Sequence, residues 1–249
     1  METFLFALIL SVIAGLSTTI GSVIAFVVKE PSKKFISIIM GFSAGVMILI
    51  SFVELLQEGI DASNFLLGST FFFIGMLLML VIDITISHKY EFEYKKGFSE
   101  DKLEKTSLLV TLGIFIHNFP EGMATFVAAL SNIKLGIILC FAIALHNIPE
   151  GIAVAVPVYV STKNSRKAFF WSFISGVSEP LGALIVGFIL FPFINDFILG
   201  AMLAVVGGFM VYISLDELLP ASRDSGFEHL SIIGIIFGMI IMTLSLSLF

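Results

Sequence analysis

Residues 135–160 of this 249-residue chain read LGIILCFAIALHNIPEGIAVAVPVYV. A helix of about 20 predominantly apolar residues crosses the hydrocarbon core of a bilayer, and this run exceeds that length. Its most polar side chains are His146, Asn147 and Glu150, which lie near its middle, and it contains no Lys or Arg. The run therefore predicts a transmembrane helix that carries a polar motif at its centre.

Seven further apolar runs of similar length flank this one. The composition agrees with a membrane protein, because 58% of the residues are hydrophobic and only 13% are charged, whereas soluble domains carry about 25% charged residues. The sequence thus predicts an all-α integral membrane protein with eight transmembrane helices in a single transporter domain, residues 1–249. The predicted spans lie at about residues 4–28, 35–57, 66–87, 107–130, 135–160, 168–190, 198–218 and 230–249.

The basic residues are distributed very unevenly between the predicted loops. Twelve of the 13 Lys and Arg residues fall in the loops that follow spans 1, 3, 5 and 7, and only Lys134 falls on the other side. Because cytoplasmic loops are enriched in Lys and Arg, these four loops, including the longest at about residues 88–106, are predicted to be cytoplasmic. Both termini then face outside, and we expect a multi-pass protein of the inner (plasma) membrane.

Two pairs of spans share sequence although they run in opposite directions. The segment GVMILISFVELL of span 2 (45–56) matches GFMVYISLDELL of span 7 (208–219) at seven of twelve positions. The segment SVIAGLSTTIG of span 1 (11–21) resembles SFISGVSEPLG of span 6 (172–182). These matches predict an inverted repeat of spans 1–3 and 6–8 around the central antiparallel pair 4 and 5, as in many secondary transporters. Chance similarity between helices that pack through Gly and Ser is the alternative.

A six-residue motif occurs twice, as HNFPEG at 117–122 and as HNIPEG at 146–151, on the two central spans. Its His and Glu are four residues apart and its Asn and Glu three, so one face of each helix presents all three side chains. Glu179 lies near the middle of span 6, at a similar depth. Three carboxylates and two imidazoles are thus predicted to meet near the centre of the membrane.

The predicted spans supply these acids with no Lys or Arg partner. A carboxylate in hydrocarbon is costly unless it is paired, so the compensating cation must come from outside, as a proton or a metal ion. Imidazole nitrogen together with carboxylate oxygen suits zinc, iron(II), manganese, cobalt or cadmium better than calcium or magnesium. Hydrogen bonding between helices is the alternative role, and the duplicated motif with a third acid favours metal binding.

Further acids lie toward the ends of the predicted spans. Glu54 and Glu58 close span 2 on the outer side, and we expect them to form an entrance for cations. Asp83, Asp216 and Glu217 lie toward the cytoplasmic side and form the expected exit. The alternative is that these acids cap helix ends or are solvated at the membrane interface. This alternative is strongest for Glu58.

With these motifs the chain resembles the ZIP (Zrt/Irt-like) family, and within it the bacterial ZupT-type members, over its whole length. The resemblance implies metal import into the cytoplasm by alternating access, with spans 1, 4, 5 and 6 moving as a unit against spans 2, 3, 7 and 8. It also implies two adjacent metal sites bridged by Glu121 and Glu150, and an inner site at the exit. By similarity, the first site is formed by His117, Glu121, His146 and Glu150, and the second by Asn118, Asn147 and Glu179 with the two bridging acids. Asn147 stands where some members carry an acid.

Other functions are weaker interpretations of the same residues. A proton- or sodium-coupled carrier of another solute would use the acids as ion sites. An intramembrane metal hydrolase would need a motif such as HExxH, which the chain lacks, so we expect neither enzyme activity nor a catalytic cofactor. The net charge of −6 does not suggest a nucleic-acid partner. The expected partners are metal ions and the lipid bilayer, and a homodimer is possible on the sequence alone.

Overall fold

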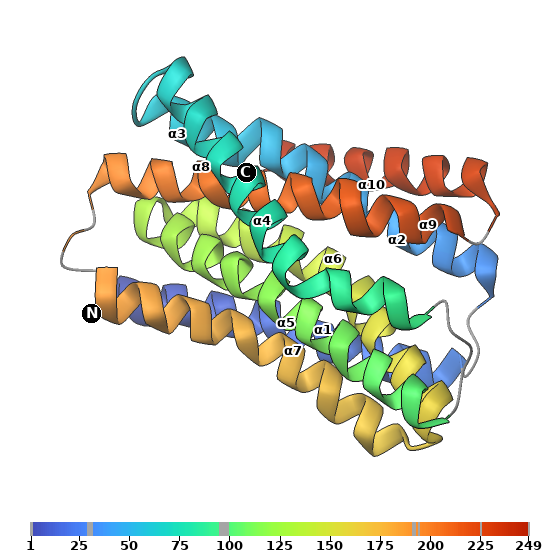
Figure 1. The fold of residues 1–249 in the computed structure, drawn as a ribbon. Coiled ribbons are helices and arrows are strands. Elements are labelled where there is room, and N and C mark those ends of the chain that lie inside the picture. The colour runs from blue at the N-terminus through green and yellow to red at the C-terminus, as the bar shows by residue number, and fades with distance from the viewer. Residues whose placement is uncertain are drawn as a thin grey trace.

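The computed structural model of this chain describes residues 2–28, 32–94, 100–190, 193, 195–224 and 226–248. Every regular element in this part of the chain is helical, and the helices lie lengthwise beside one another in an elongated bundle (Figure 1). Within the same residues, seven helices are long and apolar enough to cross a membrane. The prediction of an all-α, multi-pass membrane protein is therefore confirmed.

Ten α-helices and three π-helical segments make up the described elements. The π-helical segments continue α-helices without a break: η1 (Ser51–Leu55) joins α2 to α3, η2 (Val186–Leu190) extends α7, and η4 (Ser214–Leu218) joins α8 to α9. The α-helices are α1 Glu2–Val28, α2 Lys33–Ile50, α3 Leu56–Asp61, α4 Phe65–Tyr94, α5 Glu100–Ser131, α6 Ile133–Thr162, α7 Ser165–Ile185, α8 Asp196–Ile213, α9 Leu219–Asp224 and α10 Glu228–Leu248.

Helical structure extends into the connection predicted at residues 88–106. Helix α4 continues to Tyr94 and α5 begins at Glu100, while residues 95–99 lie outside the described residues. The segment is rich in Glu and Lys, which have high helix propensity. A helix can therefore extend beyond the apolar run from which the span was predicted, because hydropathy marks the membrane and not the helix end.

Asparagine side chains determine where three helices begin. The Oδ1 atoms of Asn132, Asn164 and Asn195 accept hydrogen bonds from backbone N–H groups two or three residues later, at the starts of α6, α7 and α8. This N-cap arrangement satisfies donors that have no partner within the helix. Because α6 begins directly after Asn132, its motif at residues 146–151 lies near the middle of a 30-residue helix.

The helices pack as two groups. Helix α1 contacts α6 and α7, and α5 also contacts α6 and α7, whereas α2 contacts α10 and α4 contacts α8. The main contacts between the groups are those of α2 with α6 and of α5 with α8. In Figure 1, α4 crosses the front of the bundle diagonally. The two motif-bearing helices thus lie in one group and face the other along their length.

Two glycines of the duplicated motif permit very close helix contact. A Cβ on Gly122 of α5 would collide with the backbone oxygen of Glu179 on α7. A Cβ on Gly151 of α6 would collide with the backbone oxygen of Thr18 on α1. Small residues at helix crossings are how membrane helices gain packing contacts, since lipid offers no hydrophobic driving force for association. The glycine that ends each copy of the motif therefore allows α5 to pack closely on α7 and α6 to pack closely on α1.

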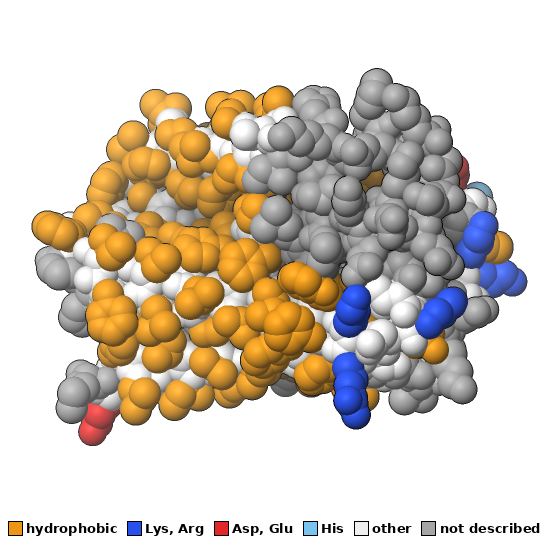
Figure 2. Space-filling view, turned by 60° about the horizontal axis from the view of Figure 1, so that its bottom comes forward, with side chains coloured by type: hydrophobic (Ala, Val, Ile, Leu, Met, Phe, Trp, Pro, Cys, Tyr) orange, Lys and Arg blue, Asp and Glu red, His pale blue; other side chains and the backbone are white. Residues whose placement is uncertain are grey.

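The outer surface matches a lipid environment. Large apolar side chains are exposed along the helices, and Phe188 is 74% exposed. In Figure 2, hydrophobic side chains cover most of the described surface on one face, and Lys and Arg side chains gather at one end of the molecule. An apolar surface of this extent is unfavourable in water and favourable in a bilayer.

Candidate metal centre

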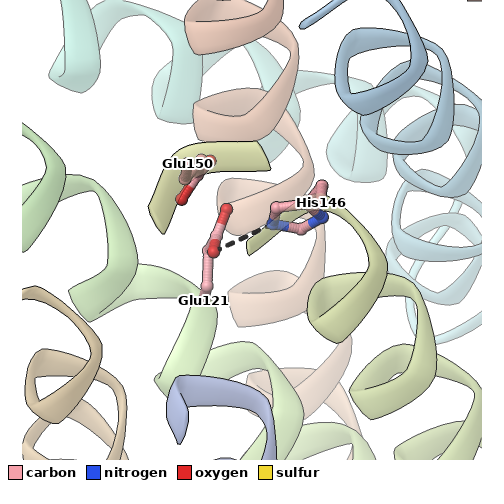
Figure 3. Close-up of side chains that lie close together, drawn as sticks. All are labelled: Glu121, His146 and Glu150. Carbon is pink, nitrogen blue, oxygen red and sulfur yellow. Dashed lines mark hydrogen bonds and ion pairs between the residues drawn. The ribbon is translucent and has the colours of Figure 1, made fainter. Parts of the chain in front are cut away.

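The antiparallel packing of α5 and α6 brings the two copies of the motif together. Glu121 comes from α5, and His146 and Glu150 come from successive turns of α6. Each offers one ligand atom, and these atoms lie within 4.8 Å of one another. Figure 3 shows the three side chains close together between the helices. The side chains are almost completely buried, at 1%, 0% and 2% exposure.

The geometry of this cluster suits a small divalent cation. The Nε2 atom of His146 lies 3.1 Å from Oε2 of Glu121. Tetrahedral ligands about 2.0–2.2 Å from a zinc ion lie roughly 3.4 Å apart. Small adjustments of the Glu121, His146 and Glu150 side chains would therefore place their ligand atoms around one ion.

A second group of polar side chains adjoins the first. The Nδ2 atom of Asn147 donates to Oε1 of Glu179 on α7 and, at 2.9 Å, to the carbonyl oxygen of Ala14 on α1. Both Asn147 and Glu179 have no exposed surface. The backbone of α6 links Asn147 to Glu150 of the first group. Because Asn147 and Glu150 are three residues apart on one face of α6, the two groups lie on neighbouring turns of that helix.

Asn118 supports Glu150 across the helix interface. With its amide nitrogen turned toward the neighbouring acceptors, Asn118 donates to Oε2 of Glu150 at 3.0 Å and to the carbonyl oxygen of Ile114 at 3.1 Å. A carboxylate that accepts a hydrogen bond keeps its remaining lone pairs for a cation. Position 117 lies within α5, but the side chain of His117 lies outside the described part of the structure. Its predicted role as a ligand stays a prediction.

The other predicted acids lie on helices of the second group. Glu54 in η1 and Glu58 in α3 are half-buried, as are Asp83 in α4 and Glu217 in η4, whereas Asp216 is exposed. None of the five belongs to the buried cluster of Glu121, His146 and Glu150 found among the described residues. Their predicted roles at an entrance and an exit stay predictions.

Tyr212 is a hydrogen-bond partner of a predicted exit acid that the sequence did not indicate. Its hydroxyl on α8 donates to Oδ2 of Asp83 on α4 at 3.2 Å. The spacing of four residues between Tyr212 and Asp216 places both on one face of the same helical run, and this was the signal that could have identified it. Tyr212 thus bonds one of the predicted exit acids, Asp83, and lies about one helical turn from another, Asp216.

Comparison with known proteins gives a consistent result over almost the whole chain. The family model described as ZIP Zinc transporter matches residues 88–246. A protein named zinc transporter ZupT from Streptococcus mutans is 49% identical over 98% of this chain and 97% of its own length. Proteins of the same name from Clostridium perfringens and Oceanobacillus iheyensis are 44% and 45% identical over 100% of this chain and 98% and 99% of their own lengths.

Proposed function

This chain belongs to the ZIP zinc transporter family, and from that premise we propose that it moves divalent transition metals into the cytoplasm through the buried His, Asn and Glu cluster, with zinc as the favoured ion and iron, manganese, cobalt and cadmium as the further candidates. The observation that carries the proposal is the convergence of Glu121, His146 and Glu150 in a site with almost no exposed surface. The central stretches of α5, α6 and α7 contain no Lys or Arg. A divalent cation is the partner that matches buried acids beside an imidazole.

The proposed architecture has eight membrane spans. Seven of them are the apolar helices described above, and α5 is the eighth. Helix α5 contains the predicted span 107–130 and packs against α1, α6 and α7. With eight spans, the basic loops fall on the cytoplasmic side and both termini face outside.

Repeat-related contacts support an inverted repeat of spans 1–3 and 6–8. Gly122 meets the backbone of Glu179, and Gly151 meets the backbone of Thr18, which occupies the matching place in the first half. The π-helical segments η1 and η4 also fall at matching places, Ser51–Leu55 and Ser214–Leu218. Two halves of this kind can exchange conformations and open a midplane site to either side in turn.

The proposed route uses the two helix groups. The group of α1, α5, α6 and α7 carries the cluster, and the group of α2, α4, α8 and α10 forms the surface against which it moves. Glu54 and Glu58 attract cations on the outer side. Asp83, Asp216 and Glu217 receive them on the cytoplasmic side, because a surface lined by charges of one sign raises the local concentration of counter-ions.

Uptake into liposomes tests the proposal. The purified chain is reconstituted into vesicles that contain a zinc-sensitive dye, and empty vesicles serve as the control. We expect zinc-dependent fluorescence that manganese, iron(II), cobalt and cadmium reduce by competition. Correctly folded protein that takes up no divalent metal would overturn the proposal and favour a proton- or sodium-coupled carrier of another solute.

Replacing Glu179 with glutamine is expected to leave one bound metal and remove the second. With neutral histidines, Glu121, Glu150 and Glu179 give a charge of −3, so one divalent ion leaves −1 and two leave +1. Without the Glu179 carboxylate these totals become 0 and +2, and excess charge is most costly at low dielectric. Metal analysis of purified wild type and E179Q measures the zinc bound per chain. Two zinc ions in both proteins would contradict the assignment.

A further inference from the structure

Thr18 carries a buried hydroxyl that has no hydrogen-bond partner among the described residues. The residue has no exposed surface, and its Oγ1 atom makes no hydrogen bond within the described part of the chain. A helical threonine ordinarily bonds the carbonyl one turn earlier, which for Thr18 is Ala14. That carbonyl already accepts from Nδ2 of Asn147 and from Oγ of Ser17. Thr18 is therefore left with an unused oxygen inside the protein.

This oxygen lies beside the second group of polar side chains. Thr18 lies one turn after Ala14, whose carbonyl oxygen accepts from Nδ2 of Asn147, and Gly151, one turn after Asn147, packs on the backbone of Thr18. The Cβ of Glu179 lies 3.3 Å from the position a Cβ would take on Gly15, which precedes Thr18 by three residues on the same face of α1. Asn147 also has an unpartnered buried atom, its Oδ1. Asn147 is bonded to Glu179, and Thr18 lies within one helical turn of the residues that contact both, so two neutral oxygens with no hydrogen-bond partner among the described residues belong to the same packed region.

Thr18 on α1 and Glu179 on α7 occupy equivalent places where these two helices pack together. The Cβ of Thr18 lies 3.3 Å from the place of a Cβ on Gly176, just as the Cβ of Glu179 lies 3.3 Å from that of Gly15. Gly15 and Gly176 also meet each other's backbone oxygens. One helix of the pair therefore presents a hydroxyl where the other presents a carboxylate.

We propose that Thr18 Oγ1 is an oxygen ligand of a second divalent cation, together with Asn147 Oδ1 and Glu179, adjacent to the Glu121, His146 and Glu150 position. This inference rests on the proposed metal transport. Because its ligands are oxygens only, the second position suits a harder cation such as Mn²⁺ better than the histidine-containing position does. The neutral hydroxyl keeps the number of carboxylates in the region at three, and this limits how tightly two ions are held together.

The test compares Thr18→Val with Thr18→Ser in the purified full-length chain. Valine has nearly the shape of threonine without the hydroxyl, and serine keeps the hydroxyl. Zinc and Mn²⁺ titrations measure the number of ions bound and the Kd of each, and thermal unfolding is measured without metal. Loss of a group that supports a metal site typically weakens binding about 10–100-fold. We expect T18V to weaken the second ion roughly tenfold or more, most clearly for Mn²⁺, with the first ion unchanged and with T18S close to wild type.

The metal-free unfolding midpoint separates a ligand role from a structural one. Since the hydroxyl makes no hydrogen bond with any described residue, T18V should unfold at the wild-type temperature or higher without metal. A lower midpoint, an unchanged second Kd, or a wild type that binds a single ion would each overturn the inference while leaving the first metal position intact. A wild type that binds no divalent metal would instead contradict the proposed function itself.

Discussion

Replacing Glu150 or Glu121 with alanine is expected to reduce zinc uptake by more than about a hundredfold while the protein still inserts into the membrane. Even residues that only support a metal ligand typically alter metal affinity about 10–100-fold, and these two carboxylates would contact the ion directly. Glu150 also accepts the hydrogen bond of Asn118, so its loss disturbs a second helix. Zinc uptake by reconstituted vesicles, normalised to the amount of folded protein, measures the effect.

Glu228→Ala is the matched control. Glu228 is an exposed acid at the start of α10, so its loss removes the same charge without touching the buried cluster. Glu150→Gln adds a variant that keeps the side-chain volume and separates loss of charge from loss of packing. Uptake near the wild-type rate in both E121A and E150A would show that the cluster does not bind the transported ion.

Gly151→Val is expected to destabilise the protein by about 3 kcal/mol or more, at the upper end of the usual cost of overpacking. The atom that a side chain would meet is the backbone oxygen of Thr18, which cannot turn away as the end of a flexible side chain can. Helices α1 and α6 would have to separate, and the position of Glu150 would move with them. The thermal unfolding midpoint in detergent, followed by size-exclusion chromatography, measures the loss.

Gly226→Asn provides the comparison for this substitution. Gly226 has a φ of 80° and no atom within 4 Å of the place where a Cβ would lie, and asparagine tolerates the left-handed conformation better than most residues. Its substitution should change the unfolding midpoint little. An unfolding midpoint of G151V equal to that of wild type would show that α1 and α6 are not held together at this contact.

The positions of the membrane helices follow closely from local sequence. Only a helix or a closed barrel satisfies every backbone hydrogen bond in hydrocarbon, so a long apolar run leaves few alternatives. Helix α6, for example, begins at Ile133, two residues before the apolar run used to predict it. Where the chain leaves the hydrocarbon this constraint ends, and the extension of α4 to Tyr94 could not be read from hydropathy.

Part of the candidate metal centre also follows from spacing within one helix. His146 and Glu150 are four residues apart, so a single helix places them on one face whatever surrounds it. The pairing of His146 with Glu121 needed a second helix at the right rotation and depth. The Gly122 and Gly151 positions in the duplicated motif indicated close approach, but not which backbone each would meet.

The amino-acid sequence was thus sufficient for the properties that depend on neighbours along the chain: helical spans, the polar face of each motif, and the excess of basic residues on one side. The partners of Asn147 on α1 and α7, the contact of Tyr212 with Asp83, and the unused hydroxyl of Thr18 depended on tertiary packing. The physical reason is that these contacts join residues far apart in the chain, from 32 residues for Asn147 and Glu179 to 133 for Asn147 and Ala14. Hydrogen bonds over such separations form only where helix rotation and depth bring donor and acceptor within about 3 Å, and no local pattern specifies either.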